Sequence, residues 1–182
     1  LFSYSAIPAG TVFSMRIQAD DPGDLKNIQV QVAGKRVGLG RSRSAEFGDA
    51  HVSIEKTMQY PLEPHPCKDM VVLYLASDLA LVRNGMPVLL PEAADFGLED
   101  AVLLSERSFM QTRRYSPWNA FYNCRMTERQ VLCKGSVIAF KPKGSLDLKA
   151  LQDLQTSLQR GLGLHVEEGL GQILVNPKWV LG

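Results

Sequence analysis

The segment from Gly38 to Gly48 combines residue types that bind phosphate through both the main chain and the side chains. It reads Gly-Leu-Gly-Arg-Ser-Arg-Ser-Ala-Glu-Phe-Gly, and two further basic residues precede it. Glycine allows positive φ angles and places no Cβ beside a ligand, so the loop can present N–H groups to phosphate or ribose. The alternative is a solvated hairpin in which the glycines only turn the chain. The candidate contacts are Lys35, Arg36, Gly38, Gly40, Arg41, Ser42, Arg43 and Gly48.

A second basic cluster, between residues 107 and 125, is interleaved with aromatic side chains. Aromatic faces stack on unpaired bases and Arg pairs with phosphate, so the pattern is typical of a platform for single-stranded nucleic acid. Its candidate contacts are Arg113, Arg114 and Tyr115. The alternative is that Trp118 and Phe121 belong to the core and the arginines lie on the surface. The cluster consists of Arg107, Arg113, Arg114, Tyr115, Trp118, Phe121, Tyr122 and Arg125.

The glycine pattern occurs a second time, because segment 161–171 repeats the glycine spacing of segment 38–48. The second copy is acidic, with Glu167 and Glu168, and His165 is its one candidate cation and a further candidate contact. In both copies the glycines follow a predicted helix and precede a predicted strand. This order excludes a Rossmann dinucleotide loop, whose glycines follow a strand and open a helix, and no Gly-Lys-Ser/Thr is present for a Walker phosphate loop.

The residues around each glycine segment predict the elements that position it. In the first copy, residues 13–19 alternate apolar and polar side chains, the period of a half-buried strand. Asp21 and Pro22 are typical of a helix start, and apolar residues follow at helical spacing. In the second copy, residues 134–140 predict a strand. Ser145 or Asp147 can then cap a helix with one apolar stripe, formed by Leu148, Leu151, Leu154 and Leu158.

Each copy therefore reads strand, helix, glycine loop, strand, and we predict an α+β protein with two ferredoxin-like (RRM-like) modules. Residues 1–60 form the C-terminal half of the first module. Its N-terminal half is expected upstream, because the sequence does not begin with Met. Residues 61–69 form a proline-rich linker. Residues 70–182 form the second module, with a central strand in the apolar run 70–82 and a basic and aromatic insertion at about 92–130.

The composition limits the classes of function. Apolar residues at 45% and charged residues at 21% are ordinary for a soluble protein, and no run is long and apolar enough for a membrane span. A formal charge of +1 argues against a free-standing basic nucleic-acid binder, so contacts must be local or shared with partners. The three cysteines lack the paired spacing of a zinc site and are expected to be reduced. No metal or other cofactor is predicted.

Four segments together resemble the RAMP proteins of CRISPR systems. They are the loop at 38–48, the stretch Arg113-Arg114-Tyr115-Ser116-Pro117-Trp118-Asn119, the strand opening at Gly135, and the closing segment 161–177. The sequence looks closest to the type III-D subunit Csx-ten, a relative of the Cas-five group. One departure concerns the last glycine loop, where family members often carry basic residues. This chain has Leu164, Val166, Glu167 and Glu168 there.

The resemblance implies a non-catalytic scaffold subunit of a type III CRISPR effector complex in the prokaryotic cytoplasm. It implies that guide RNA (crRNA) is held by backbone contact near its 5′ tag, that other effector subunits are partners, and that no metal is bound. Contact with target RNA is left open. A shared fold does not establish function by itself, so the site residues remain predictions.

Two catalytic alternatives and one structural alternative stay open. A Cas-six-like endoribonuclease would need a general acid and base, for which His51, His65 and His165 are the available histidines. A Cas-seven-like subunit that cuts target RNA would need an acidic loop with a metal ion. Asp20, Asp21 and Asp24 are instead expected to serve as turn and cap residues. A structural subunit would contact only protein. We expect no enzymatic activity.

We predict that replacing Arg41 and Arg43 together with Ala weakens RNA binding across sequences and flattens its salt dependence, because two phosphate contacts are lost. Fluorescence titrations at several salt concentrations measure both effects. An unchanged salt slope would contradict the assignment, and intact RNA binding with lost complex assembly would favour the structural alternative.

Overall fold

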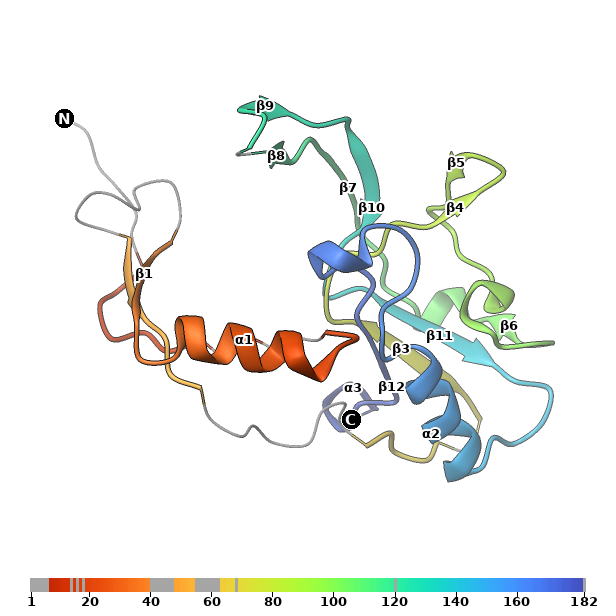
Figure 1. Cartoon of the computed structure of the whole chain (residues 1–182). Helices are drawn as coiled ribbons and strands as arrows, with labels where there is room; N and C mark the ends of the chain where they lie inside the picture. The colour runs from red at the N-terminus through yellow and green to blue at the C-terminus, as the bar shows by residue number, and fades with distance from the viewer. Residues whose placement is uncertain are drawn as a thin grey trace. The chain divides into compact units, whose positions relative to one another are not determined.

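A computed structural model of the chain (Figure 1) has a mixed α+β fold, which confirms the predicted class at this level. The structure describes residues 7–13, 15, 17, 19–39, 48–54, 63–67, 69–119 and 121–181. The chain divides into two compact units, Leu1–Met58 and Gln59–Gly182, and each is described by itself. Among the described residues, no helix combines the length and apolar character that crossing a membrane requires.

The first unit contains helix α1 (Pro22–Val32), as the sequence predicts. Asp21 is its N-cap, and the Asp21 side chain accepts a hydrogen bond of 2.8 Å from the amide of Gly23. Pro22 occupies the first helical position, where the missing amide proton costs no helical hydrogen bond. The apolar stripe of α1 is left largely uncovered within the described residues, since none of the helix residues is buried.

The strand predicted at residues 13–19 is wrong for the residues that the structure describes. Phe13, Met15 and Ile17 lie in irregular chain, and the Phe13 side chain is 72% exposed. Alternating apolar residues become a strand only when a second strand accepts their backbone hydrogen bonds. No described strand pairs with this segment.

The first glycine loop lies in a β-hairpin, and this corrects the predicted helix-to-strand bend. Strand β1 (Arg36–Gly38) pairs antiparallel with β2 (Asp49–His51), and Gly38 lies opposite Asp49. The hairpin extends by one further bond, from the amide of Leu39 to the carbonyl of Gly48. The loop thus joins two strands, as in the solvated-hairpin alternative, and its residues 40–47 lie outside the described part of the chain.

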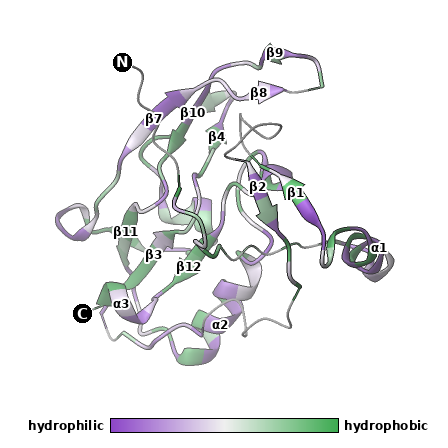
Figure 2. Cartoon of the chain, turned by 90° about the vertical axis from the view of Figure 1, so that its left-hand side faces the viewer, coloured by the Kyte–Doolittle hydropathy of each residue, from purple (hydrophilic) through white to green (hydrophobic). Residues whose placement is uncertain are grey.

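The second unit is built on a four-stranded antiparallel sheet in the order β12-β3-β11-β6. Strand β3 (Val71–Leu75) lies inside it, which confirms the central strand predicted for the apolar run 70–82. Strand β11 (Val137–Lys141) confirms the strand predicted at 134–140. The outer strands are β6 (Val102–Leu103) and β12 (Ile173–Val175). Figure 2 shows hydrophobic residues along β11 and β12 and hydrophilic residues along β7.

Helix α2 (Leu148–Ser157) packs against this sheet through the predicted leucine stripe. Asp147 is the N-cap, and Leu151, Leu154 and Leu158 are buried while Leu148 is exposed. The buried Gln155 side chain ties the helix to edge strand β12. It donates 3.0 Å to the carbonyl of Ile173 and accepts 2.8 Å from the amide of Val175. These bonds satisfy edge groups that would otherwise be buried without partners.

Two hairpins project from the sheet. Strands β4 (Val82–Arg83) and β5 (Met86–Pro87) form the smaller one. The larger hairpin spans residues 112–132 and is called the arm. Its strands β7 (Thr112–Tyr115) and β10 (Arg129–Leu132) pair with each other. Its tip carries the short pair of β8 (Trp118–Asn119) and β9 (Cys124–Arg125). The remaining elements are the 3-10 helices η1 (Ala93–Phe96), η2 (Ser105–Arg107) and η3 (Val166–Glu168), and helix α3 (Lys178–Leu181).

The second glycine loop does join a helix, α2, to a strand, β12, and close packing explains its glycines. A Cβ on Gly163 would collide with the carbonyl oxygen of Ala80, and one on Gly171 with that of Leu162. The amide of Gly171 donates 2.7 Å to the carbonyl of Asp78, and the amide of Leu162 donates 3.0 Å to Gly171. These two amides are therefore already used within the protein and are not free to contact a phosphate.

We predict that Gly171→Ala destabilises the protein far more than Gly169→Ala. Both glycines have positive φ, 75° and 87°, so each substitution costs about 1–2 kcal/mol for an L-residue in the left-handed region. Space around the Gly169 Cβ position is open, whereas at Gly171 the backbone of Leu162 must also move. Urea unfolding of both variants measures the difference, and equal losses would contradict the close-packing explanation.

Candidate nucleic-acid interface

The arm presents two different faces because side chains alternate along its strands. Tyr115 lies opposite Arg129 in the β7–β10 register, and Arg114 lies opposite Gln130. Arg113 and Tyr115 share one face, where the Arg113 guanidinium lies 4.7 Å from the centre of the Tyr115 ring. Arg114 belongs to the other face and is exposed.

The buried carboxylate of Asp78 ties the base of the arm to the sheet. Its Oδ2 atom accepts a hydrogen bond of 2.9 Å from Nε of Arg113 and pairs with the same guanidinium through Nη2. Its Oδ1 atom accepts 2.9 Å from the amide of Lys134. The hydrogen bond to Asp78 raises the pKa of Arg113. Charge-assisted bonds to a buried carboxylate are among the stronger contacts in a protein, so the base of the arm is held firmly.

A bidentate ion pair holds the middle of the arm to the second glycine loop. The two terminal nitrogens of Arg129 donate 2.6 Å and 2.7 Å to the two carboxylate oxygens of Glu168 on η3. This pairing raises the pKa of Arg129, with a smaller contribution from a hydrogen bond to Tyr115. The same pairing lowers the pKa of the Glu168 carboxyl group.

The tip of the arm exposes three aromatic side chains. Trp118 is 59% exposed, Phe121 88% and Tyr122 69%. The alternative that Trp118 and Phe121 belong to the core is therefore wrong. The Phe121 and Tyr122 rings meet edge to face at 4.9 Å, and Trp118 lies opposite the exposed Arg125 across the β8–β9 pair. Large apolar faces in water beside basic groups mark a surface for binding a partner.

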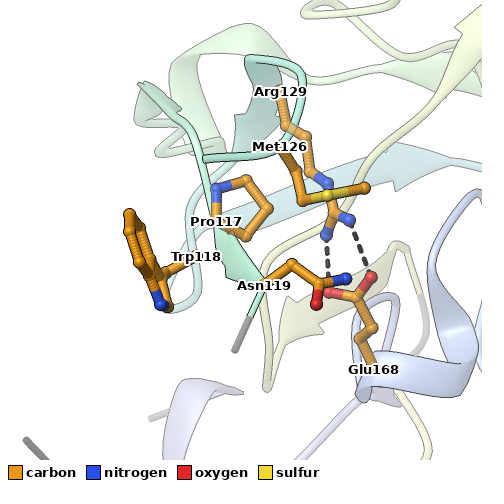
Figure 3. Close-up of a pocket in the computed structure, with 6 residues that line it drawn as sticks. All are labelled: Pro117, Trp118, Asn119, Met126, Arg129 and Glu168. Atoms are coloured by element: carbon orange, nitrogen blue, oxygen red, sulfur yellow. Dashed lines mark hydrogen bonds and ion pairs between the residues drawn. The ribbon is translucent and has the colours of Figure 1, made fainter. Parts of the chain in front are cut away.

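A polar cavity of about 280 Å³ lies between the arm tip and η3 (Figure 3). It is lined by six residues of the arm and η3: Pro117, Trp118, Asn119, Met126, Arg129 and Glu168. In Figure 3 the Asn119 side chain points toward the Arg129–Glu168 pair, whereas the Trp118 ring lies at the far side of Pro117. The cavity thus joins hydrogen-bonding groups to a neighbouring aromatic face.

The structure places the candidates of the first glycine segment in part only. Lys35 and Arg36 are exposed at the open end of the β1–β2 hairpin, and Arg36 forms an ion pair with Asp49. Gly38 and Gly48 lie at the closed end of the same hairpin. Gly40, Arg41, Ser42 and Arg43 lie outside the described residues, so their contacts stay predictions.

In the second unit, the structure brings three of the four candidates together on the arm. Arg114 is exposed, while Arg113 and Tyr115 face groups of the protein itself. His165 lies on η3's N-terminal side with a φ of 63°, and its Nδ1 atom is 3.8 Å from carboxylate oxygens of Glu167 and of Glu168. Their role in binding RNA stays a prediction.

Sequence reasoning missed Asp78, Asn119, Arg129 and Glu168 as parts of this interface. Asp78 lies within the apolar run 70–82. A buried carboxylate nonetheless needs a cationic partner, and that requirement was an available signal. The pairing of Arg129 with Glu168 joins residues 39 positions apart and had no local signal.

His165, Glu167 and Glu168 also offer atoms within 4.8 Å of one another, which is compatible with a metal ion. Glu168, however, already pairs with Arg129 through both oxygens. A guanidinium beside the site repels a cation, so the arrangement favours the ion pair over a metal centre.

No protein-family model matches this sequence, and no curated protein matches it. Solved structures show a partial likeness. Cas6 in a product complex is 16% identical to the chain with a TM-score of 0.48, and the match covers 85% of this chain and 74% of that chain. A mutant of Cas6 is 15% identical to the chain with a TM-score of 0.47, and the match covers 85% of this chain and 73% of that chain. Cas6 in a substrate mimic complex is 14% identical with a TM-score of 0.46, and the match covers 84% of this chain and 74% of that chain. At these values the likeness assigns neither a family nor a function.

We predict that Glu168→Gln lowers the free energy of unfolding at neutral pH and has less effect in acid. Because Arg129 lowers the pKa of Glu168 below its ordinary value of 4.5, the stabilisation is complete above that value and disappears as the pH falls through the lowered pKa. Urea unfolding at several pH values from about 7 to about 3, a range that includes the titration of carboxyl groups, measures this change in the free energy of unfolding.

Glu167→Gln is the matched control for this prediction, since the Glu167 side chain is 71% exposed and has no bidentate partner in the described chain. Its effect should be small at every pH. The difference in the free energy of unfolding between the wild type and Glu168→Gln should change with pH. A difference that stays constant would contradict the proposed contribution of the Glu168 charge.

Proposed function

We propose that this chain binds single-stranded RNA through the arm and serves as a non-catalytic, guide-RNA-binding scaffold subunit of a type III CRISPR effector complex. The observation that carries the proposal is the exposure of Trp118, Phe121 and Tyr122 beside basic side chains on an anchored hairpin. Each exposed ring is a face on which an unpaired base can stack, and such stacking contributes about 1–3 kcal/mol per base.

The anchoring of the arm supports binding without a large ordering cost. Ion pairs from Arg113 to Asp78 and from Arg129 to Glu168 fix the arm at two levels below its aromatic tip. A binding surface that is already ordered loses less conformational entropy when the ligand arrives. The tip therefore suits a ligand whose own flexibility must be restrained, such as a single strand.

The charge of the arm limits how RNA is held. Arg114 and Arg125 are exposed, and Arg125 lies beside Trp118 across the β8–β9 pair. With a formal charge of +1 for the whole chain, few phosphates can be neutralised. Stacking should then contribute more than counterion release, and the salt dependence of binding by this chain should be shallow.

The place of the chain in a CRISPR complex is supported by its sequence resemblance to RAMP proteins. On this proposal the fold consists of ferredoxin-like modules, guide RNA near the 5′ tag is the ligand, and other effector subunits in the prokaryotic cytoplasm are the partners. The second unit contributes a strand, helix α2, a glycine loop and strand β12 in the order expected for half of such a module.

The absence of catalysis is also proposed, because each of the three histidines has another explanation. His51 lies exposed on β2 opposite Arg36. The backbone of His65 bonds to Asn176, through its amide and its carbonyl. The Nδ1 atom of His165 lies 3.8 Å from carboxylate oxygens of Glu167 and of Glu168, and cleavage would require a further group to complete the acid–base pair. We expect no cleavage when repeat RNA is incubated with the chain.

The double variant Phe121→Ala/Tyr122→Ala tests the proposed function. We expect it to weaken the binding of a fluorescently labelled single-stranded RNA by about thirtyfold or more, because two stacking faces worth about 1–3 kcal/mol each are lost and about 1.4 kcal/mol is a factor of ten in affinity. Fluorescence anisotropy with the full chain measures the affinity, and the circular dichroism spectrum should be unchanged because both side chains are exposed.

Phe109→Ala is the control, because Phe109 is an aromatic residue of the same unit that is 57% exposed but lies outside the arm. Its RNA affinity should match the wild type. RNA binding by the arm would be contradicted if both variants lost the same RNA affinity, or if the arm variant lost none.

A further inference from the structure

The four-stranded sheet of the second unit has two edges, and they differ in how their main-chain groups are satisfied. At β12, the Gln155 side chain bonds the carbonyl of Ile173 and the amide of Val175, so that edge is closed. At the other edge (Figure 1), β6 pairs with β11 on one side and with no described strand on the other. An unpaired edge is a template on which another extended chain can pair.

The register of β6 shows which main-chain groups are open at this edge. The amide of Leu104 donates 2.8 Å to the carbonyl of Ala139 on β11. Main-chain groups point to opposite sides at successive residues of a strand, so the N–H and C=O groups of Leu103 point away from β11. Neither these groups nor those of Ala101, two residues earlier, have a hydrogen-bond partner in the described part of the chain.

A second cavity, of about 450 Å³, lies along the same edge. It is lined by residues 100–103 on and before β6, by residues 90–94, and by Leu98. Leu90 is 64% exposed and Val102 is 65% exposed, so apolar side chains of the lining are reachable from solvent. The side chains of a strand alternate between its two faces, so a strand added beside β6 would direct every second side chain toward this cavity.

The charge of the lining distinguishes between possible ligands. It includes two carboxylates, those of Glu92 and Asp100, and no basic residue. The two side chains are 68% and 69% exposed, and each pairs with one cation at the surface, Arg83 and Lys143. Exposed pairs of this kind contribute little free energy and leave the carboxylates open to other cations. Phosphate groups would be repelled, and so would the same edge of a second copy, whereas Lys or Arg would be attracted.

We propose that the outer edge of β6 binds an extended, basic peptide segment of a partner protein. The segment adds a fifth strand to the sheet, exchanging main-chain hydrogen bonds with Leu103 and placing an aliphatic side chain in the cavity. In this mode of recognition the main-chain bonds supply affinity, and the pocket for alternate side chains supplies specificity. The inference goes beyond RNA binding by the arm and does not depend on it.

A labelled peptide, Lys-Lys-Thr-Val-Thr-Val-Thr-Lys-Lys, tests the proposal in fluorescence anisotropy with the full chain. Its β-branched residues favour an extended conformation, and its valines supply the aliphatic side chains. The same peptide with Glu in place of every Lys is the charge control. We expect it to bind at least about tenfold more weakly, because its carboxylates would meet Glu92 and Asp100.

Hydrogen exchange followed by nuclear magnetic resonance reports whether the peptide pairs with the strand. The amide of Leu103 should exchange about tenfold more slowly when the peptide is saturating, because it gains an acceptor. The amide of Val102 faces β11 by the same alternation and is the internal control, so its exchange should change much less.

Leu90→Ser tests the cavity, because Leu90 belongs to its apolar lining. We expect the variant to bind the lysine peptide about tenfold more weakly, since an aliphatic contact is lost. Leu39→Ser is the matched control, because Leu39 is 60% exposed and does not line the cavity. Both variants should bind RNA as the wild type does.

The remaining outcomes overturn the proposal in distinguishable ways. No binding of the lysine peptide, or equal binding of the glutamate peptide, overturns it while leaving RNA binding by the arm standing. Binding that does not slow exchange at Leu103 overturns strand addition, and equal weakening by Leu90→Ser and Leu39→Ser overturns the role of the cavity. A dimer in analytical ultracentrifugation that Leu90→Ser dissociates assigns the edge to a second copy instead.

Discussion

The arrangement of the interface depends on the buried carboxylate of Asp78. It receives the Arg113 side chain and the amide of Lys134, while its own carbonyl accepts the amide of Gly171. Asp78, which lies shortly after the end of β3, therefore contacts the arm, the turn before β11 and the second glycine loop. Burying a carboxylate without partners costs several kcal/mol, so the arm and the turn before β11 must meet at this point in the folded state. The sheet fixes the position of Asp78, and Asp78 fixes what lies around it.

The close packing of the glycine loop then determines the chemistry of the arm. Gly163 and Gly171 allow the loop to approach the backbone of Ala80 and Leu162. This approach places η3 beside the arm, where Glu168 meets Arg129. The result is a rigid hairpin whose aromatic tip faces solvent and whose side forms a polar cavity. The glycines thus serve the interface indirectly, through shape, rather than by presenting amides to an anion.

Local signals predicted the elements of the fold well where the segment needs no distant partner. Asp21 and Asp147 cap their helices because a carboxylate beside free helical amides is stable in any context. Within the run 70–82, Val71–Leu75 form a central strand because residues buried on both faces must be apolar. The alternation at residues 13–19 was misleading, since a strand also needs a neighbour. The equal glycine spacing was misleading too, because one segment turns a hairpin and the other packs a loop.

The sequence by itself determined the α+β class, the Asp21 helix cap, the central strand and the presence of a basic and aromatic segment. Each follows from the preferences of neighbouring residues, which are readable along the chain. Only the tertiary structure decided that Trp118 and Phe121 face solvent and that Arg113 forms an ion pair with Asp78. It also decided that Arg129, Glu168 and Asn119 line one cavity. Such decisions join residues far apart in sequence, because the free energy of a charge or an aromatic face depends on which distant groups surround it.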